Sequence, residues 1–113
     1  MDRRSNTRYP AEQAVWVTDL LQPGRSAAGT IRDISNSGVC VMTTLPLIVA
    51  SIVRLDANDN VLFGFVTYAT AEDAGLRIGI DVQHVLLGDS DMSRLLQQVL
   101  QEMMPAVTLG SLY

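Results

Sequence analysis

Two polar clusters in the sequence carry side chains suited to binding a small anion. The first lies at the N-terminus and contains Arg3, Arg4 and Arg8, with no apolar residue among them to anchor the segment. A guanidinium group can meet a phosphate or a guanine edge with two parallel hydrogen bonds, and it can also stack on a purine ring. Taken alone, the cluster is equally compatible with a solvated basic tail.

The second cluster is a polar turn, Asp33-Ile34-Ser35-Asn36-Ser37-Gly38. Asp33 can accept the N1–H and N2–H donors of a guanine, a pair that adenine does not present on that edge. The Ser35 hydroxyl can bond a ring nitrogen or a phosphate, and Gly38 allows the backbone to approach a ligand closely. By itself this segment could be an ordinary Asx or Ser turn in a hairpin. The two clusters together, separated by residues 9–32, are less easily explained by chance.

Charge is distributed unevenly between the first cluster and the rest of the chain. Residues 1–8 contain three Arg and one Asp, a net +2, whereas residues 9–113 contain five Arg and eleven acids, a net −6, for a total of −4. A general nucleic-acid-binding protein needs a broad positive face, which this acidic body lacks. A basic arm on an acidic body favours a small, discrete anion.

The body of the chain is predicted to be rich in β-strands. Leu76, Ile78, Ile80 and Val82 alternate with polar or small residues, the period of two expected of a strand with one buried face. Six strands are expected, over residues 15–18, 29–34, 39–42, 52–55, 61–66 and 76–82. Short strands at close spacing favour a small six-stranded antiparallel β-barrel, which leaves no sheet edge exposed.

Toward the C-terminus the apolar period becomes that of a helix. The apolar residues at helical spacing are Met92, Leu95, Leu96, Val99, Leu100 and Met103. Asp89 or Ser90 can cap the start and Pro105 ends the run, so we expect one helix over about 89–104, covering an opening of the barrel. The apolar tail 107–113 could pack on the barrel, join a dimer interface or dock a partner, and the sequence leaves all three open.

Size and composition exclude several classes of protein. A chain of 113 residues with 48% hydrophobic residues is expected to form one domain with a real core, here residues 11–113 behind a flexible basic arm of residues 1–10. No secretory signal or membrane span is recognised, and the single cysteine, Cys40, fits a reducing, cytoplasmic compartment. With one histidine, His84, and no metal-ligand spacing or catalytic set, we expect neither an enzyme nor a metal or cofactor site.

The two clusters resemble the motifs of the PilZ domain family. Arg4 and Arg8 fulfil its RxxxR pattern, and Asp33, Ser35 and Gly38 fulfil its DxSxxG pattern. The resemblance implies a six-stranded barrel that binds the bacterial second messenger cyclic di-GMP on its outer surface, with the arm wrapping the ligand. The arginines would contact guanine faces and phosphates, and the acid and serine would bind a guanine edge.

The resemblance also implies finer features of binding. An arginine before RxxxR, here Arg3, is similar to family members that bind a stacked, intercalated pair of ligand molecules. Tyr68 falls near where some relatives place an aromatic beside the ligand, although it could equally pack on the barrel, and Asn6 could add a polar contact. The protein would relay the messenger to an unidentified effector protein, in a process such as biofilm formation or motility.

Two other functions remain to be weighed. A nucleotide-independent protein–protein adaptor in pilus or motility assembly is favoured by the helix and the apolar tail 107–113. Binding of single-stranded RNA would require stacking platforms, and the sequence offers one tryptophan and three tyrosines on an acidic body. We therefore expect cyclic di-GMP and an effector as partners, and neither DNA nor RNA.

Overall fold

The computed structural model describes residues 8–36 and 38–112. Seven strands and one helix occur in this part of the chain: β1 (Arg8–Asp19), β2 (Ser26–Ser35), β3 (Gly38–Thr43), β4 (Ile52–Ala57), β5 (Asn60–Glu72), β6 (Gly75–Leu87), α1 (Asp91–Met103) and β7 (Thr108–Ser111). The predicted helix over about 89–104 is confirmed. No helix of the described ranges is both long and apolar enough to cross a membrane.

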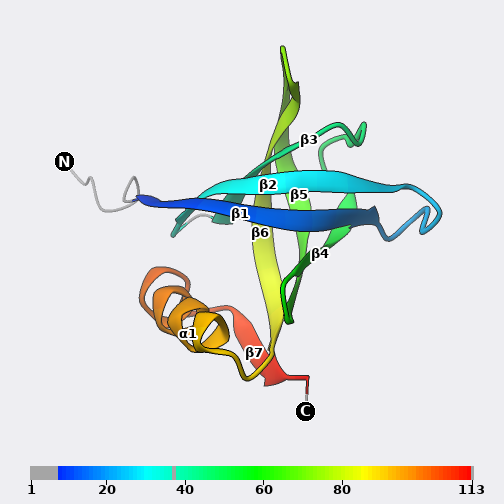
Figure 1. Ribbon diagram of the computed structural model, residues 1–113. Helices are drawn as coiled ribbons and strands as arrows, with labels where there is room; N and C mark the ends of the chain where they lie inside the picture. The colour runs from blue at the N-terminus through cyan, green and yellow to red at the C-terminus, as the bar shows by residue number, and fades with distance from the viewer. Residues whose placement is uncertain (1–7, 37, 113) are drawn as a thin grey trace.

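The strands close into the six-stranded antiparallel barrel that the sequence predicts. Neighbouring strands follow the order β3-β2-β1-β4-β5-β6, and a further pairing between β3 and β6 closes the ring. In Figure 1, β1 and β2 run across the barrel while β5 and β6 cross behind them at a steep angle. Closure matters for function because residues on four different strands can then share one outer face.

Several strands extend beyond their expected bounds, and two segments form strands where none was expected. β1 begins at Arg8, so residues 8–10, assigned above to the flexible arm, belong to the sheet, where they pair with residues 33–35 of β2. The apolar tail forms a seventh strand, β7, which runs parallel to β6 and aligns Leu109 with Val85. Parallel pairing is possible because α1 returns the chain to the start of this part of β6, and Figure 1 shows α1 and β7 together at one end of the barrel.

The inward-facing residues of the strands form the core. Its fully buried side chains include Val17, Val41, Val53, Leu55, Leu62, Val66, Ile78 and Ile80. Branched residues pack well on a pleated sheet, and burying each one stabilises the fold by about 1.5–3 kcal/mol relative to leaving it exposed. The barrel is therefore a rigid support for the side chains on its outer face.

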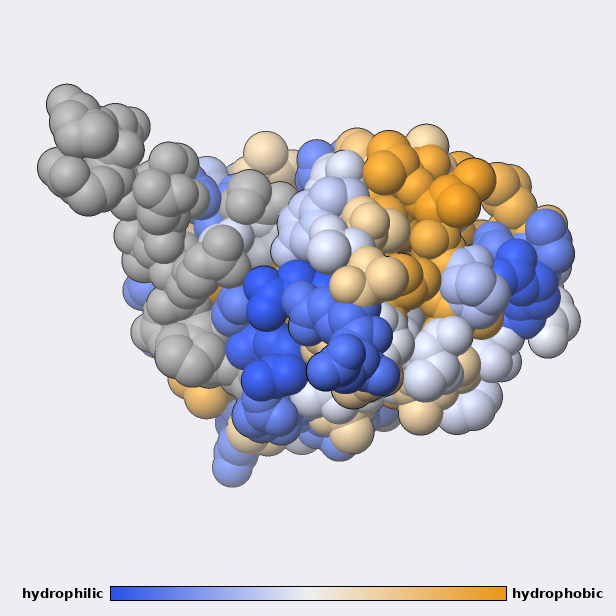
Figure 2. Space-filling view, turned by 90° about the horizontal axis from the view of Figure 1, so that it is seen from above, coloured by the Kyte–Doolittle hydropathy of each residue, from blue (hydrophilic) through white to orange (hydrophobic). Residues whose placement is uncertain are grey.

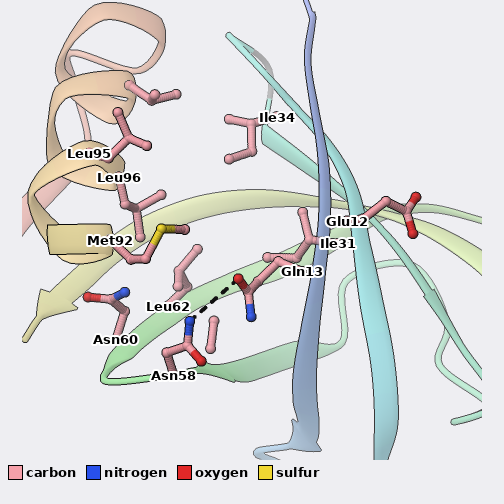
Figure 3. Close-up of a pocket in the computed structure, with 12 residues that line it drawn as sticks. Glu12, Gln13, Ile31, Ile34, Asn58, Asn60, Leu62, Met92, Leu95 and Leu96 are labelled. Atoms are coloured by element: carbon pink, nitrogen blue, oxygen red, sulfur yellow. Dashed lines mark hydrogen bonds between the residues drawn. The ribbon is translucent and has the colours of Figure 1, made fainter. Parts of the chain in front are cut away.

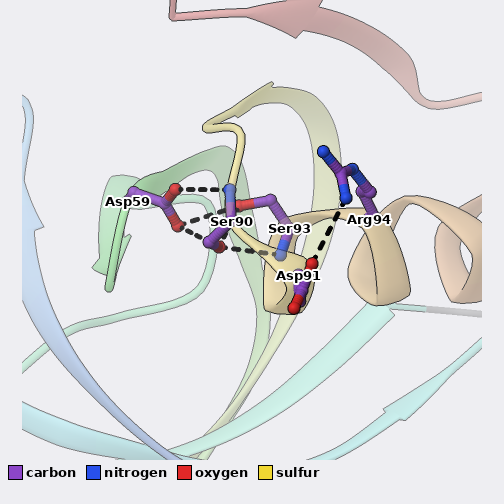
Figure 4. Close-up of polar contacts among 5 residues, drawn as sticks. All are labelled: Asp59, Ser90, Asp91, Ser93 and Arg94. Atoms are coloured by element: carbon purple, nitrogen blue, oxygen red, sulfur yellow. Dashed lines mark hydrogen bonds and ion pairs between the residues drawn. The ribbon is translucent and has the colours of Figure 1, made fainter.

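A polar network fixes the start of α1 to the β4–β5 turn. Ser90 is the N-cap, and its hydroxyl accepts a hydrogen bond from the Ser93 backbone N–H at 3.1 Å. The buried Ser93 hydroxyl lies 2.8 Å from a carboxylate oxygen of Asp59 and 2.7 Å from the side-chain oxygen of Asn60. Asp59 also accepts from the Ser90 hydroxyl at 2.9 Å (Figure 4). These contacts set the position of the helix relative to the barrel.

Candidate functional site

The pairing of β1 with β2 brings the two sequence motifs together. Arg8 lies opposite Ser35 in the ladder, and Pro10 lies opposite Asp33. The ladder is irregular between Pro10 and Gln13, which suits a proline because it has no backbone N–H to donate. The second arginine of RxxxR and the serine of DxSxxG are thus cross-strand neighbours, about 5 Å apart at Cα in such a pair.

A β-bulge in β2 turns Asp33 to the outside of the barrel. Strict alternation would place Asp33 on the same face as the buried Ile31. The β2–β3 register shifts between these two residues, leaving Arg32 as an extra residue, and the next inward side chain is Ile34. Asp33 therefore faces outward and is half-buried.

A second bulge, in β5, turns Tyr68 to the same face. Val66 faces the core, the β5–β6 register shifts between Val66 and Tyr68, and Ala69 packs against the core again. Thr67 is the extra residue, and its hydroxyl donates to the Gly79 carbonyl at 3.3 Å. Tyr68 lies on the outside with 40% of its surface exposed.

These side chains form one row across four strands. Asp33 lies opposite Cys40, Cys40 opposite Gly79, and Gly79 opposite Tyr68. Residues directly opposite one another in a sheet project to the same face. The row therefore begins at the acid Asp33, passes the small residues Cys40 and Gly79, and ends at the aromatic ring of Tyr68. We call Asp33, Ser35, Gly38, Cys40, Gly79 and Tyr68 the outer row.

The middle of the outer row is shaped by Gly79. A Cβ atom at this position would collide with the Tyr68 ring, so glycine allows the ring to lie flat against the sheet. Partial burial raises the pKa of Tyr68 to about 12, and a hydrogen bond with Cys40 and the negative charge of Asp33 act in the same direction. The positive charge of Arg77 partly offsets these effects. Tyr68 thus packs on the barrel and still offers part of its surface to a ligand.

Gly38 holds the turn of the second motif against β6. Its φ is +134°, a backbone conformation that residues with a side chain rarely adopt, and a Cβ atom at this position would collide with the Ile80 carbonyl. The buried Ser35 hydroxyl donates to the Gly38 carbonyl at 3.5 Å. The glycine of DxSxxG is therefore required by the backbone of this turn.

The structure places part of the predicted site. It brings Asp33, Ser35, Gly38 and Tyr68 to one face and aligns the Arg8 backbone with them. Arg3, Arg4 and Asn6 lie outside the described residues, and for Arg8 the description covers the backbone.

Sequence reasoning did not single out Cys40, Gly79 or Arg77 as part of this face. Arg77 lies opposite Met42 in β3 and is ion-paired with Glu72 at 3.0 Å. The alternation of residues 76–82 does mark Arg77 and Gly79 as outward-facing, but their proximity to Asp33 depends on the β3–β6 pairing that closes the barrel. That pairing has no local signal in the sequence.

A cavity of about 350 Å³ lies between α1 and the barrel. Its apolar lining is formed by Ile31, Ile34, Ala57, Leu62, Met92, Leu95, Leu96 and Val99. Figure 3 shows the helix side chains pointing across it toward the barrel, with the Asn58 amide donating to the Gln13 side-chain oxygen at 3.5 Å at its rim. Ile34 belongs to this cavity while its neighbours Asp33 and Ser35 belong to the outer row. One strand therefore contributes to both.

Comparison with known proteins gives no family assignment. No protein-family model matches the chain, and no curated protein matches it. Among the described residues, no group of three or more His, Cys, Asp or Glu is arranged to hold a metal ion.

Proposed function

We propose that this chain is a bacterial cyclic di-GMP receptor and adaptor of the PilZ kind. The observation that carries the proposal is the meeting of the two motifs: Arg8 lies opposite Ser35, and two bulges turn Asp33 and Tyr68 to the same outer face. Bulges are over-represented beside functional sites, where they redirect a side chain.

The chemistry of the outer row fits a guanine base. The Asp33 carboxylate accepts the two N–H donors of the guanine edge, and the Ser35 hydroxyl supplies a donor or acceptor beside it. The Tyr68 ring lies over Gly79, and its exposed part offers a surface on which a flat base can stack beside Asp33. In the proposed complex Arg8, whose backbone pairs with Ser35, contacts the same base or its phosphate.

The charge of the ligand is met by the arginine cluster. Cyclic di-GMP carries two phosphates, which an acidic body repels unless cations intervene. In the proposed complex Arg4 and Arg8 contact guanine faces and phosphates, and Arg3 stacks on a further guanine so that an intercalated pair of ligands is held. Asn6 adds a polar contact within the same segment.

The proposed signal is the ordering of the N-terminal segment on the barrel by the ligand. The resulting surface engages or releases an effector protein in the cytoplasm, in a process such as biofilm formation or motility. Ordering a segment on binding costs free energy, so the affinity is expected to be moderate and sensitive to salt.

Guanine selectivity tests the proposal. Asp33→Ala is expected to weaken cyclic di-GMP binding by about 10- to 100-fold, the loss of a charge-assisted hydrogen bond, and to narrow the preference over cyclic di-AMP. Calorimetric titration of both nucleotides into the wild type, the variant and a control, Asp91→Ala, makes the comparison. Asp91 is an exposed acid on α1, away from the outer row. An unchanged preference in Asp33→Ala would remove Asp33 from the site.

A nucleotide-independent adaptor is the second candidate. The observation in its favour is the apolar cavity beside α1, together with Met92 and Leu95, which are 52% and 53% exposed along its edge. This function predicts a partner bound equally well with and without cyclic di-GMP, and no effect of arginine substitutions. The receptor function predicts the opposite on both counts.

A further inference from the structure

A second row of side chains lies beside the outer row on the same four strands. It consists of Thr30, Met42, Arg77 and Thr70, each directly opposite the next across the sheet. Arg77 is two residues from Gly79 on β6, so both face outward and their Cα atoms are about 7 Å apart. We call these four residues the second row.

A hollow of about 370 Å³ opens on the outside of β2 and β3 beside the second row. Thr30 and Met42 line it, together with Arg32 and with Ala74 of the β5–β6 turn. Figure 2 looks down on the molecule of Figure 1 and shows hydrophilic residues gathered near the middle of the face, where the β5–β6 turn projects toward the viewer. The surface next to the outer row is therefore polar and has room for a ligand that extends beyond that row.

Arg77 supplies a positive charge to the second row. Its Nε atom lies 3.0 Å from a carboxylate oxygen of Glu72, the last residue of β5. The charge also acts on the outer row: partial burial raises the pKa of Tyr68, and the positive charge of Arg77 opposes that rise. Arg77 is therefore close enough to the outer row to interact with a charged group bound there.

The ion pair of Arg77 with Glu72 is exposed and easily exchanged. The two side chains keep 51% and 38% of their surface exposed, and such pairs stabilise a fold little because water screens them. Arg54 on β4, by contrast, makes three hydrogen bonds to Asp56. A guanidinium can bind a phosphate through two parallel hydrogen bonds, so a phosphate that reaches Arg77 can displace Glu72.

Arg77 and the backbone of Arg8 lie on opposite sides of the outer row. Arg8 pairs with Ser35 on one side of the line from Asp33 to Tyr68, and Arg77 lies on the other side. Residues 9–113 carry a net charge of −6, so an anion on this surface is repelled wherever a cation does not face it. Cyclic di-GMP has two phosphates, and a ligand lying across this line meets an arginine of the chain on each side.

We propose that Arg77 exchanges Glu72 for a phosphate of the nucleotide held at the outer row. The proposal rests on the receptor function proposed above and adds Arg77 as a ligand-binding residue. Glu72 acts as a competing anion, which holds Arg77 in the free protein and is displaced by the ligand. The hollow beside the second row gives the phosphate and its ribose space to enter.

A double-mutant cycle, measured by calorimetric titration with cyclic di-GMP, tests this exchange. Arg77→Gln is expected to weaken binding about 5- to 20-fold, because a charge-assisted contact is lost. Glu72→Gln is expected to strengthen binding about 3- to 10-fold, because Arg77 is released from its competitor. In the double variant the Glu72→Gln change should add less than about twofold, since Arg77 is no longer there to be released.

Arg54→Gln and Asp56→Asn are the matched controls. They change the net charge in the same way but alter an ion pair on β4, which lies three strands from β3 in either direction around the ring. Both variants are expected to bind cyclic di-GMP within about twofold of the wild type, because the solvent screens charges at that distance.

The outcomes separate this exchange from the receptor function. Wild-type affinity in Arg77→Gln would overturn the exchange and leave the receptor function intact. An equal loss in Arg54→Gln, or a gain from Glu72→Gln that persists in full without Arg77, would do the same. A wild type that binds no cyclic di-GMP would contradict the receptor function and, with it, the role of Arg77.

Discussion

Arg8 lies directly opposite Ser35 across the β1–β2 ladder. The sequence separates these residues widely, and the antiparallel pairing of two strands makes them neighbours. β1 begins at Arg8, so the backbone of the last arginine of the first motif lies in the ladder beside the second motif. The position of this backbone is therefore set by strand register.

Arg8→Ala is expected to weaken cyclic di-GMP binding at least about tenfold, because a charge-assisted hydrogen bond to guanine or phosphate is lost. The melting temperature should stay within a few degrees, since alanine keeps the backbone pairing with Ser35. Calorimetry and thermal denaturation measure the two effects. Arg94→Ala, which removes an exposed arginine of α1, is the control and should bind like the wild type. Equal affinities for both variants would place the ligand elsewhere.

Tyr68 gives the outer row a spectroscopic signal. Because its pKa is raised to about 12, an absorbance titration at high pH is expected to show an ionisation step near pH 12 that Tyr68→Phe lacks. In the unfolded chain the Tyr68 side chain ionises near pH 10. The contribution of neutral Tyr68 to the stability of the fold is therefore complete below pH 10 and is lost as pH rises toward 12. The free energy of unfolding, measured with urea between pH 10 and pH 12, should fall more steeply for the wild type than for Tyr68→Phe. A step near pH 12 that persists in Tyr68→Phe would contradict this environment.

Asp59 makes the attachment of α1 dependent on acid. Hydrogen bonds from Ser93, and then from Ser90, lower the pKa of Asp59 below its ordinary value of 3.8. The contribution of ionised Asp59 to the stability of the fold is therefore present above about pH 4. It is lost as pH falls through the lowered pKa of Asp59 in the folded chain. Urea midpoints from pH 6 to pH 3 should fall further for the wild type than for Asp59→Asn, which cannot ionise.

Asp91→Asn serves as the control for this pH dependence. Asp91 also lies at the start of α1, but its side chain is 99% exposed and paired with Arg94. Asp91→Asn keeps the contacts of Asp59 with Ser90 and Ser93, so the fall in urea midpoint that depends on these contacts is expected to remain. Parallel profiles for the wild type and Asp59→Asn would show that the carboxylate does not hold the helix.

The sequence predicts the elements of the fold better than their register. Alternation in residues 76–82 and helical spacing after residue 90 are local signals, and both elements form as expected. The bulges at Arg32 and Thr67 are set by how neighbouring strands meet, so strict alternation does not reveal them. β7 was missed because its parallel pairing with β6 depends on the path of the chain through α1.

The same distinction applies to the site. The motif types identified Asp33, Ser35 and Gly38, and the structure gives Gly38 a backbone reason, its φ of +134° against β6. The contribution of Gly79 becomes visible only after β3 and β6 close the barrel. The candidate side chains could thus be named from the sequence, whereas the shape of the surface around them required the fold.

The most direct test of the receptor function is a calorimetric titration of the whole chain with cyclic di-GMP. The account predicts saturable binding with a fitted stoichiometry near two ligands per chain, which weakens as salt is raised because phosphates are held by guanidinium groups. A value near one would retain the receptor and remove the intercalated pair assigned to Arg3. No heat at any concentration, with an NMR spectrum unchanged by the nucleotide, would contradict the central claim and leave the adaptor function.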